Sequence, residues 1–276
     1  MAPLRDLTPE EKAKPYSKYF YQEPAPPAPE LARLLQDPKP IDPSDALPIE
    51  RLNDLLNPGY LKVETGFCTL PNGGAYVAVN NKMPGVTADM VNWWFAWHAL
   101  EDLRYMLWFP RDHYAISISE EDRKKVLDPD RPLVLKFQGT THHVVEDIGN
   151  GTEDLYISFM TPEEFGFDTA RFKPPAVATL VAANVLVKRP GDPSDAPGLP
   201  AAMCHFIREI SDGIEFRSRF WLGYQIIDRE PRFALPPGVK IPLSVPAGLF
   251  KHCIEEYANL RAILPQIYAE QEGRVP

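Results

Sequence analysis

The residues best suited to metal chemistry lie near the C-terminal end of this 276-residue chain, in the stretch GLFKHCIEEYANLRAIL at residues 248–264. His252 and Glu256 are four residues apart, so in a helix both side chains lie on the same face. An imidazole and a carboxylate at this spacing can bind one metal ion together. Because such pairs are also common on ordinary helix surfaces, the spacing by itself leaves both interpretations open.

The two adjacent glutamates of this helix have different predicted surroundings. At about 100° per residue, Glu256 lies at the edge of an apolar stripe, whereas Glu255 lies beside Lys251 on the side that faces solvent. A carboxylate turned toward a core costs several kcal/mol unless it is paired. Glu256 is therefore predicted to need a partner. The stripe consists of Leu249, Phe250, Cys253, Tyr257, Leu260 and Leu264.

Further ligands must come from other segments, and the chain has six histidines in all. His113 lies in FPRDHYAIS, after a proline that ends a predicted helix. In THHVVEDIG, the alternation of a strand puts His142 and Glu146 on one face. His205 lies on the apolar face of the predicted strand MCHFIREI and is expected to point into the interior.

A second predicted helix contains a rival pair. His98 and Asp102 are also four residues apart, and they form a stripe with Tyr105 in HALEDLRY. His98 can equally be a hydrogen-bonded histidine in a tryptophan-rich core, since buried polar groups are almost always paired. Spacing does not decide between this pair and the pair in the last helix.

The segments that carry these residues are predicted to form an α+β fold. A largely buried helix is expected from the N-cap Thr87 to Pro110, and a long final helix from about Pro246. A curved antiparallel sheet around the final helix leaves a cavity between them, where we expect the chemistry. Period-two patterns predict its strands at residues 133–137, 141–149, 154–160 and 176–189, and a hairpin at 203–224 that turns at 211–213.

Prolines are frequent in residues 22–48, where they remove backbone donors and restrict the chain. We interpret residues 1–58 as an N-terminal arm, which either packs on the main body or a second subunit, or is a disordered leader. Residues 59–276 form the predicted main domain. It opens with a predicted hairpin at residues 64–79 that has Asn-Gly as its turn. Near the end of the domain, residues 229–246 are predicted to form a loop.

The composition limits the partners. A formal net charge of -9 argues against nucleic acid or an anionic membrane, both of which favour clustered Lys and Arg. The three cysteines are far apart in sequence, which predicts neither a disulfide framework nor a cysteine zinc site. The sequence shows neither the apolar core of a signal peptide nor the roughly 18 apolar residues of a membrane span. We therefore expect a cytoplasmic protein with a small-molecule partner.

Four segments together carry a resemblance to a known family: VNWWFAWHALEDLRYMLWFPRDHY, THHVVEDIG, CHFIREISDGIEFRSRFWLGY and HCIEEY. Over about residues 50–265 the sequence resembles the diacetylphloroglucinol and phloretin hydrolase family. The resemblance implies a zinc-dependent hydrolase that cleaves the carbon–carbon bond between a polyhydroxylated aromatic ring and an acyl group. It also implies a helix-grip (Bet v1-like) fold with an N-terminal extension involved in dimerisation, and hence a homodimer.

The resemblance also implies roles for individual residues. Tyr105 is implied to form a hydrogen bond to the substrate, and His205 is similar to a pocket histidine of the family. Ile116 stands where the family has an asparagine, which leaves the preferred acyl group open. The implied Zn²⁺ ligands are His113, Glu146, His252 and Glu256.

An aryl ketone resists hydrolysis because its leaving group is an aryl carbanion, so the ring carbon must first be protonated through a keto tautomer. Tyr105 and His205 are our candidates for phenol binding and proton transfer, and His205 is suited to shuttling a proton near pH 7. Trp94, Trp97 and Phe220 can stack on an aromatic substrate or simply pack in the core.

Two other functions fit the same expected cavity. Helix-grip domains also serve as carriers of hydrophobic ligands, and such a carrier needs no metal. A polyketide cyclase or dehydratase of this fold needs the region around His205 but not the four ligands. Metal content and sensitivity to a chelator distinguish both from the hydrolase.

Overall fold

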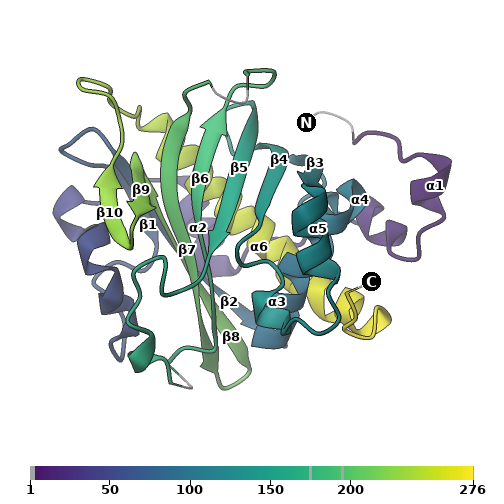
Figure 1. The fold of residues 1–276 in the computed structure, drawn as a ribbon. Helices are drawn as coiled ribbons and strands as arrows, with labels where there is room; N and C mark the ends of the chain where they lie inside the picture. Colours follow the sequence, from purple (N-terminus) through teal and green to yellow (C-terminus); the bar gives the residue numbers. More distant parts are fainter. Residues whose placement is uncertain (1–3, 174–175, 194–195, 276) are drawn as a thin grey trace.

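The structure is a computed structural model that describes residues 4–173, 176–193 and 196–275. Its centre is an eight-stranded antiparallel sheet with the strand order β1-β2-β8-β7-β6-β5-β4-β3 (Figure 1). The strands are β1 (Gly66–Thr69), β2 (Ala75–Pro84), β3 (His113–Ile118), β4 (Thr141–Asp147), β5 (Thr152–Met160), β6 (Thr179–Lys188), β7 (Leu199–Ile210) and β8 (Gly213–Leu222). A separate two-stranded ribbon pairs β9 (Tyr224–Ile227) with β10 (Glu230–Phe233).

The last helix, α6 (Ser244–Glu270), crosses one face of this sheet, which we call the inner face (Figure 1). Its buried side chains join those of the inner face in the main hydrophobic core. The predicted large antiparallel sheet with a long C-terminal helix is therefore confirmed. The finer helix-grip assignment stays a prediction.

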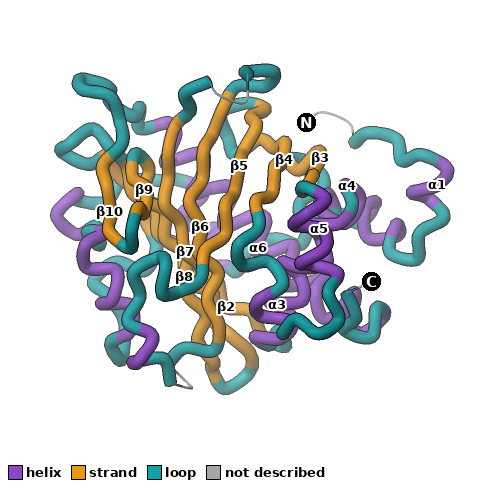
Figure 2. Tube along the Cα trace, in the orientation of Figure 1, coloured by secondary structure: helices purple, strands orange, loops and turns teal. Residues whose placement is uncertain are grey.

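The remaining helices are short. Figure 2 shows helical segments flanking both ends of the row of strands. The α-helices are α1 (Pro9–Lys12), α2 (Pro29–Gln36), α3 (Ala88–Trp97), α4 (Asp102–Met106) and α5 (Glu120–Leu127). The 3₁₀ segments are η1 (Ser17–Tyr21), η2 (Pro43–Asp45), η3 (Ile49–Leu56), η4 (His98–Leu100), η5 (Leu133–Leu135) and η6 (Thr169–Arg171).

The N-terminal arm packs on the main body at several places. Tyr16 of its first part lies edge-on against Trp97, with ring centroids 5.0 Å apart. Further along, η3 covers the outer face of the sheet, where Leu52 and Leu55 are buried in a second hydrophobic cluster. The indole N–H of Trp221 donates to the carbonyl of Leu47 at 2.8 Å and ties that segment to the sheet. The boundary at residue 58 and a role in dimerisation stay predictions.

The predicted hairpins agree with the structure. β1 and β2 pair around Asn72 and Gly73, and Gly73 has a φ of +94°, a conformation that favours glycine. β7 and β8 pair from Ile210 opposite Gly213, so the turn lies at the expected place. The strands predicted at 141–149, 154–160 and 176–189 correspond to β4, β5 and β6.

The single helix predicted from Thr87 to Pro110 is wrong. This segment instead forms three helical pieces, because the chain becomes extended at Glu101, with φ -161° and ψ 137°. Before this break, the side chain of His98 bonds back to the carbonyl of Trp94. After it, the carboxylate of Asp102 accepts the backbone N–H of Ile116 at 2.8 Å. The break lets α4 turn toward β3, which was not predicted as a strand.

Two other predictions fail locally. Residues 133–137 were expected as a strand but begin with the 3₁₀ segment η5, because buried Lys136 donates to the carbonyls of Val126 and Asp128 and holds the chain in a turn. The segment at 229–246 was expected as a loop but contains β10. Asp228 and Arg229 have positive φ values, which make the tight turn that pairs β10 with β9.

In the part of the chain that the structure describes, no helix has the length and apolar character needed to cross a membrane. The three cysteines are buried and free.

Candidate active site

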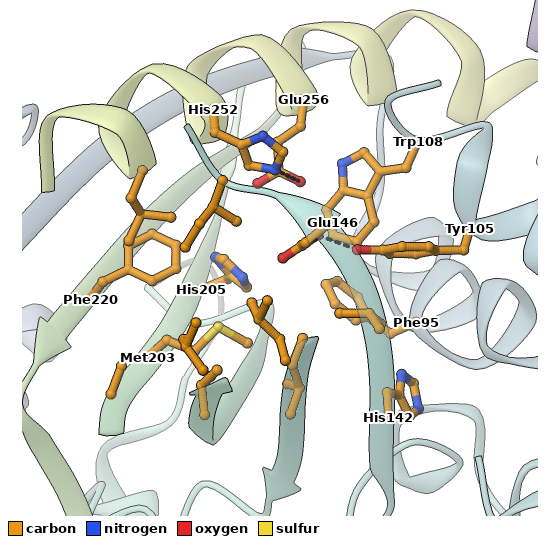
Figure 3. A pocket seen from close by; sticks show the side chains of 18 of the residues that line it. Phe95, Tyr105, Trp108, His142, Glu146, Met203, His205, Phe220, His252 and Glu256 are labelled. Atoms are coloured by element: carbon orange, nitrogen blue, oxygen red, sulfur yellow. Dashed lines mark hydrogen bonds and ion pairs between the residues drawn. The ribbon is translucent and has the colours of Figure 1, made fainter. Parts of the chain in front are cut away.

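A cavity lies between the inner face of the sheet and α6, as the sequence predicted (Figure 3). It contains about 760 Å³ of space between atoms, part of which is open to solvent. Most of its lining is aliphatic or aromatic, and the polar groups that reach it are few: Tyr105, His98, His142, Glu146, His205, His252, Glu256 and Tyr257.

The first pair of predicted ligands comes from two neighbouring strands. His113 of β3 lies directly opposite Glu146 of β4 in the antiparallel register. The register shifts just after His113, and such a bulge redirects a side chain. As a result the Nε2 atom of His113 lies 3.3 Å from Oε2 of Glu146, with both side chains buried.

The second pair comes from one helix face. His252 and Glu256 of α6 are both buried, and the Nε2 atom of His252 lies 3.8 Å from Oε2 of Glu256. Glu255 instead points to Lys251 on the solvent side, at 3.2 Å. The helical-wheel argument therefore chose the buried glutamate correctly.

The two pairs meet at His113. Its Nε2 atom lies 3.3 Å from Nε2 of His252 and 3.7 Å from Oε2 of Glu256. Figure 3 shows His252 and Glu256 descending from α6 toward Glu146. The four residues implied as ligands thus converge at one wall of the cavity, although they come from three elements far apart in the chain.

The spacing and the donor types of this cluster fit a divalent cation. Four ligands about 2.0–2.1 Å from one zinc ion, arranged tetrahedrally, lie about 3.3 Å from one another. The measured separations among His113, His252 and Glu256, 3.3 to 3.8 Å, are near that edge length, and these three side chains form a buried group that could hold a metal ion. Glu146 adjoins this group through His113, at 3.3 Å. Two imidazoles with two carboxylates are also a donor set that zinc accepts.

The outer nitrogens of both imidazoles are held by acceptors. Nδ1 of His113 lies 3.4 Å from the carbonyl oxygen of Tyr105, and Nδ1 of His252 lies 3.3 Å from Oδ2 of Asp112. A carbonyl or carboxylate at Nδ1 fixes the proton there and leaves the lone pair of Nε2 for a metal. Asp112 was not singled out in the sequence, although it precedes His113 directly.

The electrostatics of the cluster indicate a shortage of positive charge. Burial, together with the repulsion of Glu146 and Asp112, raises the pKa of Glu256 to about 8. Burial likewise raises the pKa of Glu146. Burial alone lowers the pKa of His252, but the surrounding carboxylates outweigh it and raise the pKa to about 9. A bound divalent cation relieves this repulsion between carboxylates.

Tyr105 lies against the cluster. Its ring stacks on His113 with centroids 4.4 Å apart and an angle of 4° between the planes. Its hydroxyl donates to Oε2 of Glu146 in a short hydrogen bond (Figure 3). Burial, followed by the charge of Glu146, raises the pKa of Tyr105 well above its ordinary value. The hydroxyl is therefore protonated at neutral pH.

His205 lines the cavity from β7, as predicted, and lies in a relay of hydroxyl groups. Its Nδ1 atom is 2.9 Å from Oγ of Ser218, and its Nε2 atom is 3.1 Å from the hydroxyl of Tyr257. Burial lowers the pKa of His205 to about 3. Desolvation disfavours the charged ring, so His205 is neutral at pH 7. Tyr257 was seen in the sequence only as part of the apolar stripe.

The rival ligand pair is not brought together. His98 is buried and lines the cavity, whereas Asp102 is exposed and bonds to the backbone of β3. Ile116 is buried in the main core and is not among the lining residues.

Of the aromatic residues considered for stacking on a substrate, one lines the cavity and two do not. Phe220 lines the cavity. Trp94 and Trp97 pack in the core, with Trp97 stacked on Trp93 at 4.9 Å.

The apolar cavity with its converging imidazole and carboxylate groups is typical of an enzyme active site. Comparison with known proteins shows the family to which the chain belongs. Residues 47–269 match the DAPG hydrolase PhiG domain, and the chain belongs to that family. It is 40% identical over 269 residues to a phloretin hydrolase from Eubacterium ramulus, covering 95% of this chain and 92% of that protein. It is 30% identical over 272 residues to a 2,4-diacetylphloroglucinol hydrolase from Pseudomonas protegens, covering 93% and 84%.

Proposed function

We propose that this protein is a zinc-dependent hydrolase that cleaves the carbon–carbon bond between a polyhydroxylated aromatic ring and an acyl group. The observation that supports the proposal is the buried group of His113, His252 and Glu256 at the wall of an apolar cavity, with Glu146 3.3 Å from His113. Membership of the DAPG hydrolase family, with phloretin and diacetylphloroglucinol hydrolases as relatives, supports the choice of substrate class.

The four side chains are the proposed ligands of the cation. When bound, the cation supplies Lewis-acid polarisation of an acyl oxygen and of a water molecule. The chain itself orients the ligands, since Asp112 and the carbonyl of Tyr105 hold the outer nitrogens of the imidazoles. The apolar lining excludes bulk water and accepts the aromatic ring, which Phe220 is able to contact.

The net reaction adds water across the carbon–carbon bond. The acyl carbon receives the hydroxyl group, and the ring carbon receives a proton. We assign the binding of a phenolic oxygen to the hydroxyl of Tyr105, which is already held by Glu146. His205 is neutral at pH 7, so we assign it the passage of a proton at Nε2, with the hydroxyl of Tyr257 as its neighbour in the relay.

The test is an assay of the purified protein with phloretin and with 2,4-diacetylphloroglucinol, in which the deacylated ring product is followed by chromatography. We expect product from at least one compound, its loss after a chelator has removed the metal, and its return when zinc is added back. Full turnover by metal-free protein, or no product from zinc-loaded protein with either compound, overturns the proposal.

The same assay separates the hydrolase from the alternatives. A carrier of hydrophobic ligands binds the compounds and leaves them intact, with or without zinc. A cyclase of this fold keeps its activity after chelation. A homodimer and a cytoplasmic location remain predictions, which light scattering and fractionation of the source cells test.

A further inference from the structure

Asn259 is a buried polar residue of α6 that the proposed reaction does not use. It lies three residues after Glu256 and seven after His252, so it is on the same face of the helix as both proposed ligands. The residue is 5% exposed. Because a buried amide costs free energy unless it is hydrogen-bonded, the partners of Asn259 indicate what it does.

The amide nitrogen of Asn259 bonds to the segment between α4 and β3. Nδ2 donates to the carbonyl of Trp108 at 2.9 Å and to that of Leu107 at 3.2 Å. Leu107 is the C-cap of α4, and the last carbonyls of a helix have no partner within the helix. Among the described residues, no other side chain of α6 forms a hydrogen bond with the backbone of residues 107–113. Asn259 therefore fixes the end of α4 to α6.

The segment that Asn259 fixes leads directly into the other half of the cluster. Between Trp108 and His113 the chain forms a turn, in which the backbone N–H groups of Asp112 and His113 both donate to the carbonyl of Phe109, at 3.1 and 3.0 Å. Five residues folded in this way transmit a shift of Trp108 to His113. The bonds of Asn259 thus control how far the imidazole of His113 lies from that of His252.

The Pro-rich arm holds the same amide from the outside. The amide oxygen of Asn259 accepts the backbone N–H of Ala25 at 3.1 Å. Residues 24–27 read Pro-Ala-Pro-Pro, so Ala25 is the one residue of these four that has a backbone N–H. Next to it, Glu23 pairs with Arg111 at 2.6 Å. The arm therefore contacts both α6 and the segment that Asn259 fixes.

We propose that Asn259 is a positioning residue of the metal site, which holds the segment of His113 at the distance from α6 that a shared cation requires. The N–H of Ala25 locks the amide, because a rotated amide would turn its oxygen toward the two carbonyls of that segment. The inference rests on the proposed function. It makes the N-terminal arm part of the support of the metal site in its own chain.

The test is the affinity of the purified full-length protein for zinc, measured by competition with a chromophoric chelator. Asn259→Leu removes both donors, adds no charge and keeps a residue that favours helix. We expect the dissociation constant for zinc to rise about tenfold or more. Asn184→Leu is the matched control, since the amide of Asn184 also donates to and accepts from backbone, at Ile226 of β9. It should lose resistance to denaturant and keep the zinc affinity of the wild type.

A second variant tests the lock and leaves α6 unchanged. Ala25→Pro deletes one N–H, and the loss of one hydrogen bond should weaken zinc binding about fivefold. Ala28→Pro is its control, because Ala28 has a φ of -56°, which proline adopts, and its N–H forms no hydrogen bond among the described residues. If Asn259→Leu does not fold, Ala25→Pro decides the proposal.

Unchanged zinc affinity in folded Asn259→Leu overturns the positioning role, and so does an equal loss of affinity in Asn184→Leu. Unchanged affinity in Ala25→Pro overturns the lock. Failure of the proposed function looks different, since zinc-loaded wild type would then cleave neither phloretin nor 2,4-diacetylphloroglucinol. The comparison of zinc affinities needs no turnover and still decides the role of Asn259 in that case.

Discussion

The Nε2 atoms of His113 and His252 lie 3.3 Å apart, and each ring is held from behind at Nδ1. Without a metal, the raised pKa of His252 puts a proton on its Nε2 atom, which can donate to the lone pair of neutral His113. A bound cation would take the place of that proton between the two nitrogens. The carboxylates of Glu146 and Glu256 complete the cluster. A helix pair and a cross-strand pair that are far apart in sequence thus build one cluster.

Removing a ligand should remove the metal. We expect His252→Ala and Glu256→Ala to purify with much less bound zinc than the wild type and without detectable hydrolysis, because each removes a donor from the buried group that holds the ion. Elemental analysis and the phloretin assay measure both effects. Glu255→Ala is the matched control on the same helix, and it should keep zinc and activity. Stoichiometric zinc in Glu256→Ala would contradict the assignment.

Asp112 is expected to act through His252 as a positioning residue. Asp112→Asn weakens the acceptor at Nδ1 and should lower the affinity for zinc about 10- to 100-fold. Competition with a chromophoric chelator measures the affinity directly, a quantity that a purely structural role leaves unchanged. Asp130→Asn, at an exposed turn, is the control. An unchanged zinc affinity in Asp112→Asn would show that the carboxylate does not orient the ligand.

Tyr105→Phe should separate substrate chemistry from metal binding. The stacking on His113 is kept, so zinc content should be unchanged, while loss of the hydroxyl should lower kcat about 10²- to 10⁴-fold. Single-turnover kinetics on zinc-loaded protein measure the effect. Tyr114→Phe removes an exposed hydroxyl nearby and should be neutral. Wild-type kcat in Tyr105→Phe would exclude the hydroxyl from the reaction.

The outer face of the sheet depends on one carboxylate. Glu64 pairs with Arg217 at 2.7 Å and with Arg219 at 2.6 Å, and both guanidinium groups are fully buried. Glu64→Ala leaves two buried cations without their partner and should lower the free energy of unfolding by about 3–5 kcal/mol. Chemical denaturation measures it, with Glu255→Ala as the control, since the partner of that carboxylate, Lys251, is exposed to solvent. A change below about 1 kcal/mol would mean that the ion pairs contribute little.

The ion pairs of Glu64 should also make the stability of the protein depend on pH. Burial by itself raises the pKa of Glu64, but the two arginines outweigh it and lower the pKa below its ordinary value. The carboxylate therefore adds stability that is complete above the unfolded-state value of about 4.3. This stability is lost as the pH falls through the lower folded-state value. Unfolding curves between pH 7 and 3 should show a smaller acid loss for Glu64→Ala than for the wild type.

The sequence allowed the local parts of the site to be predicted. Regular geometry is enough to put Glu256 rather than Glu255 toward the core, because α6 is an uninterrupted helix at that point. Strand alternation likewise puts His142 and Glu146 on one face of β4. The convergence of the four ligands was implied only by resemblance to a family, since nothing local to His113 shows which strand it pairs with.

The parts that could not be predicted depend on long-range contacts. The end of α3 is set by side chains that bond to distant backbone, such as Asp102 to Ile116. The turn at residues 133–135 depends on the burial of Lys136, which a pattern of apolar residues does not reveal. The low pKa of His205 follows from complete burial in the assembled cavity rather than from its neighbours in sequence.

The central claim is that four side chains hold one divalent cation at the wall of the cavity. Crystals of zinc-loaded protein, measured on both sides of the zinc absorption edge, test it most directly. We predict one strong anomalous peak about 2.0–2.2 Å from Nε2 of His113, Nε2 of His252 and the carboxylates of Glu146 and Glu256. A peak at other side chains, or none between these four, would contradict the account.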